Sequence, residues 1–150
     1  MRIRKYNPNK DFLFILNSEK TFIETHGESV NIKSAYLKKY WNHDGLNIYI
    51  LEHKGVQIGY VIAVYNGKHY ELNTIYMKNG YRNKGFMFKL LSFLLKEISS
   101  NEKIIAEHLS GDTAAQKTLI KCGFVYQKVE KNYYDNNKDS LVYEINLKDL

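Results

Sequence analysis

The chain has 150 residues, which favours a single domain over 1–150, and its hydrophobic share of 44% is ordinary for a globular protein. Its one cysteine excludes an internal disulfide, and we expect a cytoplasmic protein because no long apolar run or signal-peptide pattern is present. The formal net charge is +6. The basic residues are scattered and do not alternate with aromatic residues, which favours solubility and attraction of an anionic ligand over nucleic-acid binding.

Hydrophobic periodicity predicts an α/β sandwich around a mixed sheet, with elements in the order β-αα-βββ-α-β-α-ββ. Pro8 favours the start of the first helix, and Asn66-Gly67 predicts a tight hairpin turn. In chain order the predicted elements are a strand over 1–6, helices over 8–25 and 32–41, strands over 47–52, 56–65 and 70–77, a helix ending at Ser99, a strand over 103–109, a helix from Thr113, and two strands that begin at Phe124 and flank a loop at 135–138.

The segment from Tyr81 to Leu91 lies between a strand pattern and a helix pattern. The first turn of a helix has unpaired N–H groups and the positive end of the helix dipole. Gly85 lets an anion approach the backbone closely, and Arg82 and Lys84 add positive charge. The segment therefore predicts a phosphate-binding turn, with a solvated strand–helix turn as the alternative.

Two ordered motifs carry a family resemblance. The first, Arg82-x-x-Gly85-x-Met87, resembles the Arg/Gln-x-x-Gly-x-Gly/Ala signature of the GNAT superfamily of N-acetyltransferases, except that Met87 stands where a small residue is usual. The second runs from Asp112 to Phe124 and resembles Asn-x-x-Ala-x-x-Leu-Tyr-x-Lys-x-Gly-Phe. In it Asp112 replaces the usual Asn, where it can cap the helix that follows.

The resemblance implies a GNAT-like fold, a mixed and mostly antiparallel central sheet with helices on both faces and strands that splay apart at the cofactor site. It also implies acetyl-CoA as acyl donor, an amine as acceptor and no metal; the five His and one Cys show no metal-ligand spacing. Carried over onto this sequence, the cofactor-binding residues are Tyr76, Met77, Arg82, Asn83, Lys84, Gly85, Phe86, Met87, Asp112, Ala115 and Lys121.

Acetylation of an amine requires a proton acceptor, because an alkyl ammonium has a pKa of about 10.4. Counted back from Arg82 without gaps, Glu71 matches the strand glutamate that serves as general base in histone-type members of the family. A surface glutamate in a salt bridge is the alternative. Asn73 shares the face of Glu71 under strict strand alternation and could orient a water. A backbone amide near Tyr76 or Met77 is expected to meet the oxyanion.

The general acid is less clear from the motif. Many family members place a tyrosine in the second motif to protonate the leaving thiolate, but this chain has Leu119 there. Leucine cannot donate a proton, so the thiolate must take one from water or from another tyrosine. Tyr126, Tyr133 and Tyr134 are the candidates, and Tyr126 is the one we place in the catalytic set.

Two functional hypotheses follow. The first is an N-acetyltransferase that moves an acetyl group from acetyl-CoA to a primary amine of a small molecule or protein, by direct attack with general-base assistance. The alternative is a non-catalytic GNAT-fold module that binds CoA or a partner, which the leucine in the second motif motivates. Many proteins of the family pair through their last strands, so we expect 140–147 to form an edge for a homodimer.

Overall fold

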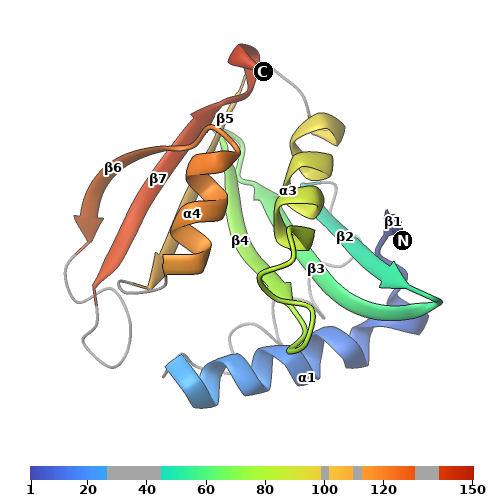
Figure 1. Cartoon of the computed structure of the whole chain (residues 1–150). Coiled ribbons are helices and arrows are strands. Elements are labelled where there is room, and N and C mark those ends of the chain that lie inside the picture. Colours follow the sequence, from blue (N-terminus) through green and yellow to red (C-terminus); the bar gives the residue numbers. More distant parts are fainter. Residues whose placement is uncertain (27–44, 99–101, 110–112, 131–138) are drawn as a thin grey trace.

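The computed structural model describes residues 1–26, 45–98, 102–109, 113–130 and 139–150 (Figure 1). Within them the predicted order of elements is confirmed, and the helix expected over 32–41 lies outside them. The elements are β1 (Arg2–Lys5), α1 (Pro8–His26), β2 (Leu46–His53), β3 (Val56–Tyr65), β4 (Tyr70–Met77), α3 (Phe86–Glu97), β5 (Lys103–Leu109), α4 (Thr113–Lys121), β6 (Val125–Glu130), β7 (Ser140–Asn146) and the short 3-10 helix η1 (Leu147–Asp149).

The strands form one seven-stranded sheet in the order β1-β2-β3-β4-β5-β7-β6. Every neighbouring pair is antiparallel except β4 and β5, which are parallel. The prediction of a mixed and mostly antiparallel sheet is therefore confirmed. The prediction that 140–147 forms an edge is wrong, because β7 pairs with β5 on one side and β6 on the other, which leaves β6 at the edge.

Helices cover both faces of the sheet, as expected. Helices α3 and α4 pack on one face and α1 crosses the other (Figure 1). Two separate hydrophobic clusters fill these interfaces, a large one beneath α3 and α4 and a smaller one beneath α1. Among the described residues, no helix combines the length and the apolar character needed to cross a membrane.

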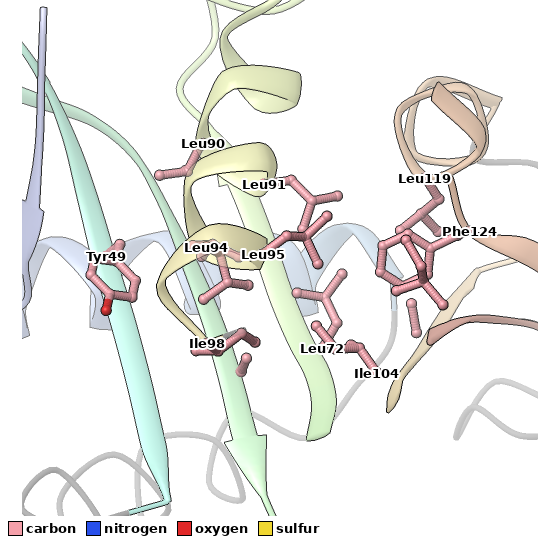
Figure 2. Packing of buried hydrophobic residues seen from close by; sticks show 14 of the residues in the cluster. Tyr49, Leu72, Leu90, Leu91, Leu94, Leu95, Ile98, Ile104, Leu119 and Phe124 are labelled. Atoms are coloured by element: carbon pink, nitrogen blue, oxygen red, sulfur yellow. The ribbon is translucent and has the colours of Figure 1, made fainter. Parts of the chain in front are cut away.

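The larger cluster depends on the apolar stripe of α3. Leu90, Leu91 and Leu94 recur at helical spacing and are fully buried. Figure 2 shows these leucines facing the sheet, while Leu119 and Phe124 approach from the side of α4. Each buried leucine stabilises the fold by about 1.5–3 kcal/mol through area removed from water. This packing fixes the position of the amino end of α3.

The parallel pair β4–β5 opens into a splay. The two strands pair only along Tyr70–Leu72 and Ile104–Ala106. Strand β4 continues to Met77 and β5 to Leu109, and Figure 1 shows them diverging toward their arrowheads. Asn73 is an extra residue where the ladder with β3 shifts register. A β-bulge of this kind bends its strand, so its position at the end of the β4–β5 ladder accounts for the divergence.

Candidate functional site

A loop joins the end of β4 to α3 and turns on left-handed residues. Gly80, Asn83 and Gly85 have φ angles of 93°, 60° and 82°, conformations that glycine adopts freely and asparagine tolerates. Gly85 caps α3 without a side chain, and the amide of Lys89 donates to its carbonyl at 3.1 Å. Nothing in the described part of the chain accepts a hydrogen bond from the amides of residues 86–88. These donors therefore remain available for an anion.

The space in front of this loop is open and positively charged. A Cβ atom built on Gly80 or Gly85 would meet no heavy atom within 4 Å. Arg82 and Lys84 are exposed. The Arg82 Nε donates to the Met77 carbonyl at 2.9 Å, which ties the loop to the strand and uses one of five guanidinium N–H groups. The loop thus combines backbone donors, room for a ligand and two cations.

Helix α4 adds a third cation to this end of α3. The Lys121 Nζ lies 4.3 Å from the centroid of the Phe88 ring, which belongs to the first turn of α3. Phe86 and Met87 beside it are half-buried and pack against the larger hydrophobic cluster. The bulky side chain of Met87 therefore turns toward the core, away from the open space. Ala115 lies half-buried in α4. The predicted cap at position 112 lies outside the described residues.

The direction of the Met77 amide follows from the hydrogen bonds at the end of β4. The Lys78 amide donates to the Ile58 carbonyl at 2.7 Å, so it points toward β3. Because amides alternate in direction along an antiparallel strand, the Tyr76 amide also points toward β3 and the Met77 amide points away from it. The hydrogen bond from Arg82 to the Met77 carbonyl agrees with this direction. Of the two expected oxyanion donors, Met77 therefore faces the splay. The Tyr76 ring packs beneath α1.

Glu71 lies on β4 one residue before the ladder with β5 ends. Its neighbour Leu72 is buried beneath α3 and α4, so Glu71 points to the face that α1 covers. Its side chain is 57% exposed. The Asn66 Nδ2 donates to the Glu71 Oε1 at 3.2 Å, and the His69 Nε2 lies 3.6 Å from the same oxygen. The sequence pattern predicts a turn at Asn66 and assigns no role to His69, but a tight hairpin turn is the signal that brings both residues back beside β4.

Asn73 does not follow the alternation on which its predicted role rested. Leu72 and Ile75 both pack in the cluster beneath α3 and α4 although they are three residues apart. Strict alternation would place them on opposite faces, so the bulge at Asn73 breaks the pattern. Asn73 is exposed at the mouth of the splay. Its position relative to Glu71 can no longer be argued from strand periodicity.

Tyr126 lies far from the splay. It belongs to the edge strand β6, and its ring centroid is 5.6 Å from that of Tyr143, which is buried beneath α3 and α4. Strands β5 and β7 separate β6 from β4, so three strand spacings, about 14 Å, separate Tyr126 from Glu71. The structure therefore does not bring the predicted general acid to the predicted base. Residues 133–134 lie outside the described residues.

Metal ligands do not gather in this region. Across the described ranges, no three His, Cys, Asp or Glu side chains are placed to hold a metal ion. The first-turn amides of α3, the cations of the loop and α4 and the Met77 amide lie beyond the point where β4 and β5 stop pairing, whereas Glu71 lies within that ladder, six residues before Met77. Together they can hold an elongated polyanionic ligand whose reactive end enters the splay.

Comparison with known proteins gives a consistent result. A model described as the acetyltransferase (GNAT) family matches residues 13–124. The ribosomal-protein-alanine N-acetyltransferase of Brucella melitensis has a TM-score of 0.80 at 20% identity, covering 97% of this chain and 99% of that one. The spermidine N-acetyltransferase of Vibrio cholerae, solved with CoA and spermine, has a TM-score of 0.79 at 18% identity, covering 98% and 95%.

A third similar structure is that of yncA from Salmonella typhimurium, which contains its cofactor acetyl-CoA. Its TM-score is 0.77 at 17% identity, covering 98% of this chain and 94% of that one. None of the curated proteins compared with the sequence matches it. At these identities the structural likeness establishes the fold, and the family rests on the match over residues 13–124.

Proposed function

The chain belongs to the acetyltransferase (GNAT) family, and on that premise we propose that it transfers an acetyl group from acetyl-CoA to a primary amine of a small molecule or protein. By their names, two of the similar structures act on spermidine and on the alanine of a ribosomal protein, so both acceptor classes occur among them. Attack by the amine forms a C–N bond, breaks the C–S bond of the thioester and releases one proton.

The amino end of α3 is the observation that carries this proposal. Its first-turn amides have no acceptor in the described part of the chain, Arg82 and Lys84 are exposed in the loop just before them, and Lys121 reaches the ring of Phe88 in that turn. A pyrophosphate suits this site because both backbone dipoles and side-chain cations favour negative charge there. The splay between β4 and β5 begins at the same end of the sheet, so an extended ligand held at the loop reaches between the strands.

Two groups of β4 supply the catalytic roles. Glu71 receives the proton of the attacking amine, directly or through a water, because only a neutral amine has the lone pair that attacks. The Met77 amide donates to the carbonyl oxygen as negative charge develops on it. Acetyl-CoA supplies the activated acyl group as a thioester. With Tyr126 on the edge strand, the thiolate takes its proton from water.

The test measures amine-dependent thiol release from acetyl-CoA, with the acetylated product identified by mass spectrometry. The acceptors are spermidine, a lysine-containing peptide and a peptide that begins with alanine. We expect Glu71→Gln to lower kcat by about 10²–10⁴-fold, the usual contribution of a general base, with little change in acetyl-CoA affinity. The matched control Glu130→Gln alters a carboxylate on the edge strand and leaves turnover unchanged. Equal turnover of wild type and Glu71→Gln across pH would exclude Glu71 as the base.

A non-catalytic module is the second candidate. The observation that favours it is Leu119, which is 3% exposed within the core and offers no proton donor from α4. Such a module would bind acetyl-CoA at the same loop and release no thiol. Thiol release above background with any amine of the panel excludes the hypothesis of a non-catalytic module. Binding of acetyl-CoA without release across the whole panel supports it.

A further inference from the structure

In the β3–β4 hairpin, the two polar atoms of the Asn66 side chain have different partners: Oδ1 bonds the turn and Nδ2 bonds Glu71. The Asn66 Oδ1 accepts hydrogen bonds from the backbone amides of Lys68 and His69, both at 3.0 Å. The backbone amide of Asn66 donates to the His69 carbonyl at 3.1 Å. These bonds define the turn, and an asparagine or aspartate oxygen is the usual acceptor for them. The Nδ2 end of the side chain makes none of these bonds to the backbone of the turn.

The side-chain Nδ2 of Asn66 contacts the carboxylate of Glu71, the proposed general base. The Asn66 Nδ2 donates to the Glu71 Oε1 at 3.2 Å. The His69 Nε2 lies 3.6 Å from Oε1 and 3.3 Å from the Asn66 Nδ2. Both contacts therefore fall on the same carboxylate oxygen. Among the residues that the structure describes, no hydrogen bond is donated to the other oxygen of Glu71, Oε2, so it can accept a proton.

We propose that Asn66 is a positioning residue that holds the carboxylate of Glu71 in one orientation where the β4–β5 ladder ends and the splay begins, with Oε2 left to meet the acceptor amine. This inference rests on the proposed function, in which Glu71 is the base. A strand glutamate that is 57% exposed would otherwise sample several rotamers. A base must lie within hydrogen-bond reach of the proton it removes, so an anchored carboxylate spends more time in the productive geometry.

A test of this contact by a charged substitution must take the other charges near Glu71 into account. Other charged groups lie on the same face of the sheet. Besides His69, they include Lys103 and Glu107 on β5, Glu144 on β7 and the group of Arg4, Asp11 and Glu52 at the far side of the sheet, and Lys103 pairs with Glu144 at 3.6 Å. None of these is altered by a substitution at the turn.

The matched variant is Asn66→Asp. It keeps the oxygen that accepts from the amides of Lys68 and His69, so the turn is retained, and it replaces the Nδ2 donor by a negative oxygen next to Glu71. We expect the acidic limb of the kcat/KM profile to move up by about one pH unit, because a nearby like charge disfavours the carboxylate. On that limb the rate falls about tenfold, while KM for acetyl-CoA and the thermal midpoint stay unchanged.

Two further measurements separate this inference from the proposed function. Asn66→Asp combined with Glu71→Gln should show no loss beyond that of Glu71→Gln alone. The pKa of the Glu71 carboxyl, measured by carbon NMR in wild type and in Asn66→Asp, reports on the contact independently of catalysis. We expect this pKa to be higher in the variant. If Glu71→Gln abolishes turnover but Asn66→Asp leaves both the pH profile and the Glu71 titration unchanged, the positioning role is wrong while the base stands. If Glu71→Gln keeps full turnover, both are wrong.

Discussion

At the residue scale, Gly59 sets how closely β3 and β4 approach each other beside the site. Gly59 pairs with Met77, whose amide faces the splay. A Cβ atom on Gly59 would lie 2.7 Å from the Tyr76 carbonyl oxygen and 2.9 Å from the Met77 sulfur. Real Cβ atoms do not tolerate such distances, so any side chain at this position must displace the end of β4.

We therefore expect Gly59→Ala to destabilise the protein by about 1–3 kcal/mol, the usual cost of inserting a methyl group into a packed interior. Urea unfolding of wild type and variant measures the difference. The control is Val56→Ala on the same strand, where the side chain is 51% exposed and we expect a change within about 0.5 kcal/mol. Equal unfolding midpoints for Gly59→Ala and wild type would contradict this, because they would mean that β4 moves to make room for the methyl group with no loss of stability.

Local motifs predicted part of the site and missed the rest for a physical reason. Arg82, Gly85 and Lys121 could be placed from sequence because each belongs to a short motif around one helix end. The bulge at Asn73 depends on the register between β3 and β4, which no local pattern encodes. The distance of Tyr126 from the splay depends on β7 lying inside the sheet, which is a property of the topology.

At the element scale, α1 is attached to the sheet by a buried ion pair. Asp11 in its first turn is fully buried and accepts two hydrogen bonds from the Arg4 guanidinium at 2.8 Å. It also accepts from the Gln57 Nε2 at 3.0 Å and from the Asn7 amide at 2.7 Å. Burial alone would raise the pKa of the Asp11 carboxyl, but these hydrogen bonds outweigh it and lower the pKa.

The direction of that shift predicts a pH dependence. An unfolded aspartate has a pKa of about 3.9, so the contribution of Asp11 to stability is fully present above that pH and is lost as pH falls through the lower folded-state pKa. We expect Asp11→Asn to cost about 1–3 kcal/mol at pH 7, because Arg4 loses one of its two carboxylate partners and keeps Glu52. The deficit should shrink in acid. Urea unfolding at several pH values measures it, with Asp149→Asn in η1 as the exposed control. A deficit that is constant down to pH 2 would contradict this account.

Most elements could be predicted because their periodicity is strong. The stripe of α3 and the alternating strands follow directly from the sequence, and the Asn66-Gly67 turn joins β3 to β4 as expected. The splay could be expected only from the family resemblance. Hydrophobic patterns show that β4 and β5 exist, but the number of residues over which they pair depends on the bulge and on the packing of α3 and α4.

At the scale of the whole molecule, the features that favour an anionic ligand gather at one end of the sheet. The loop over 78–85 and the amino ends of α3 and α4 lie at the end where β4 and β5 diverge (Figure 1). The C-terminal helix η1 lies at the opposite end. A net charge of +6 strengthens attraction of a polyanion over the whole surface. The loop adds backbone donors and open space to this charge, so binding should depend on this end of the molecule.

The proposed function depends on acetyl-CoA binding at the loop, and thermal unfolding measures this binding without turnover. The comparison is between wild type, Lys84→Glu at the loop and Lys148→Glu in η1, each with and without acetyl-CoA. The two variants make the same change in charge at opposite ends of the sheet. At 100 times its dissociation constant, a ligand stabilises the fold by about 2.7 kcal/mol. We predict a rise in the unfolding midpoint for wild type and Lys148→Glu, and a much smaller rise for Lys84→Glu. An equal response of the two variants, or no response of wild type at millimolar acetyl-CoA, would contradict binding at the loop.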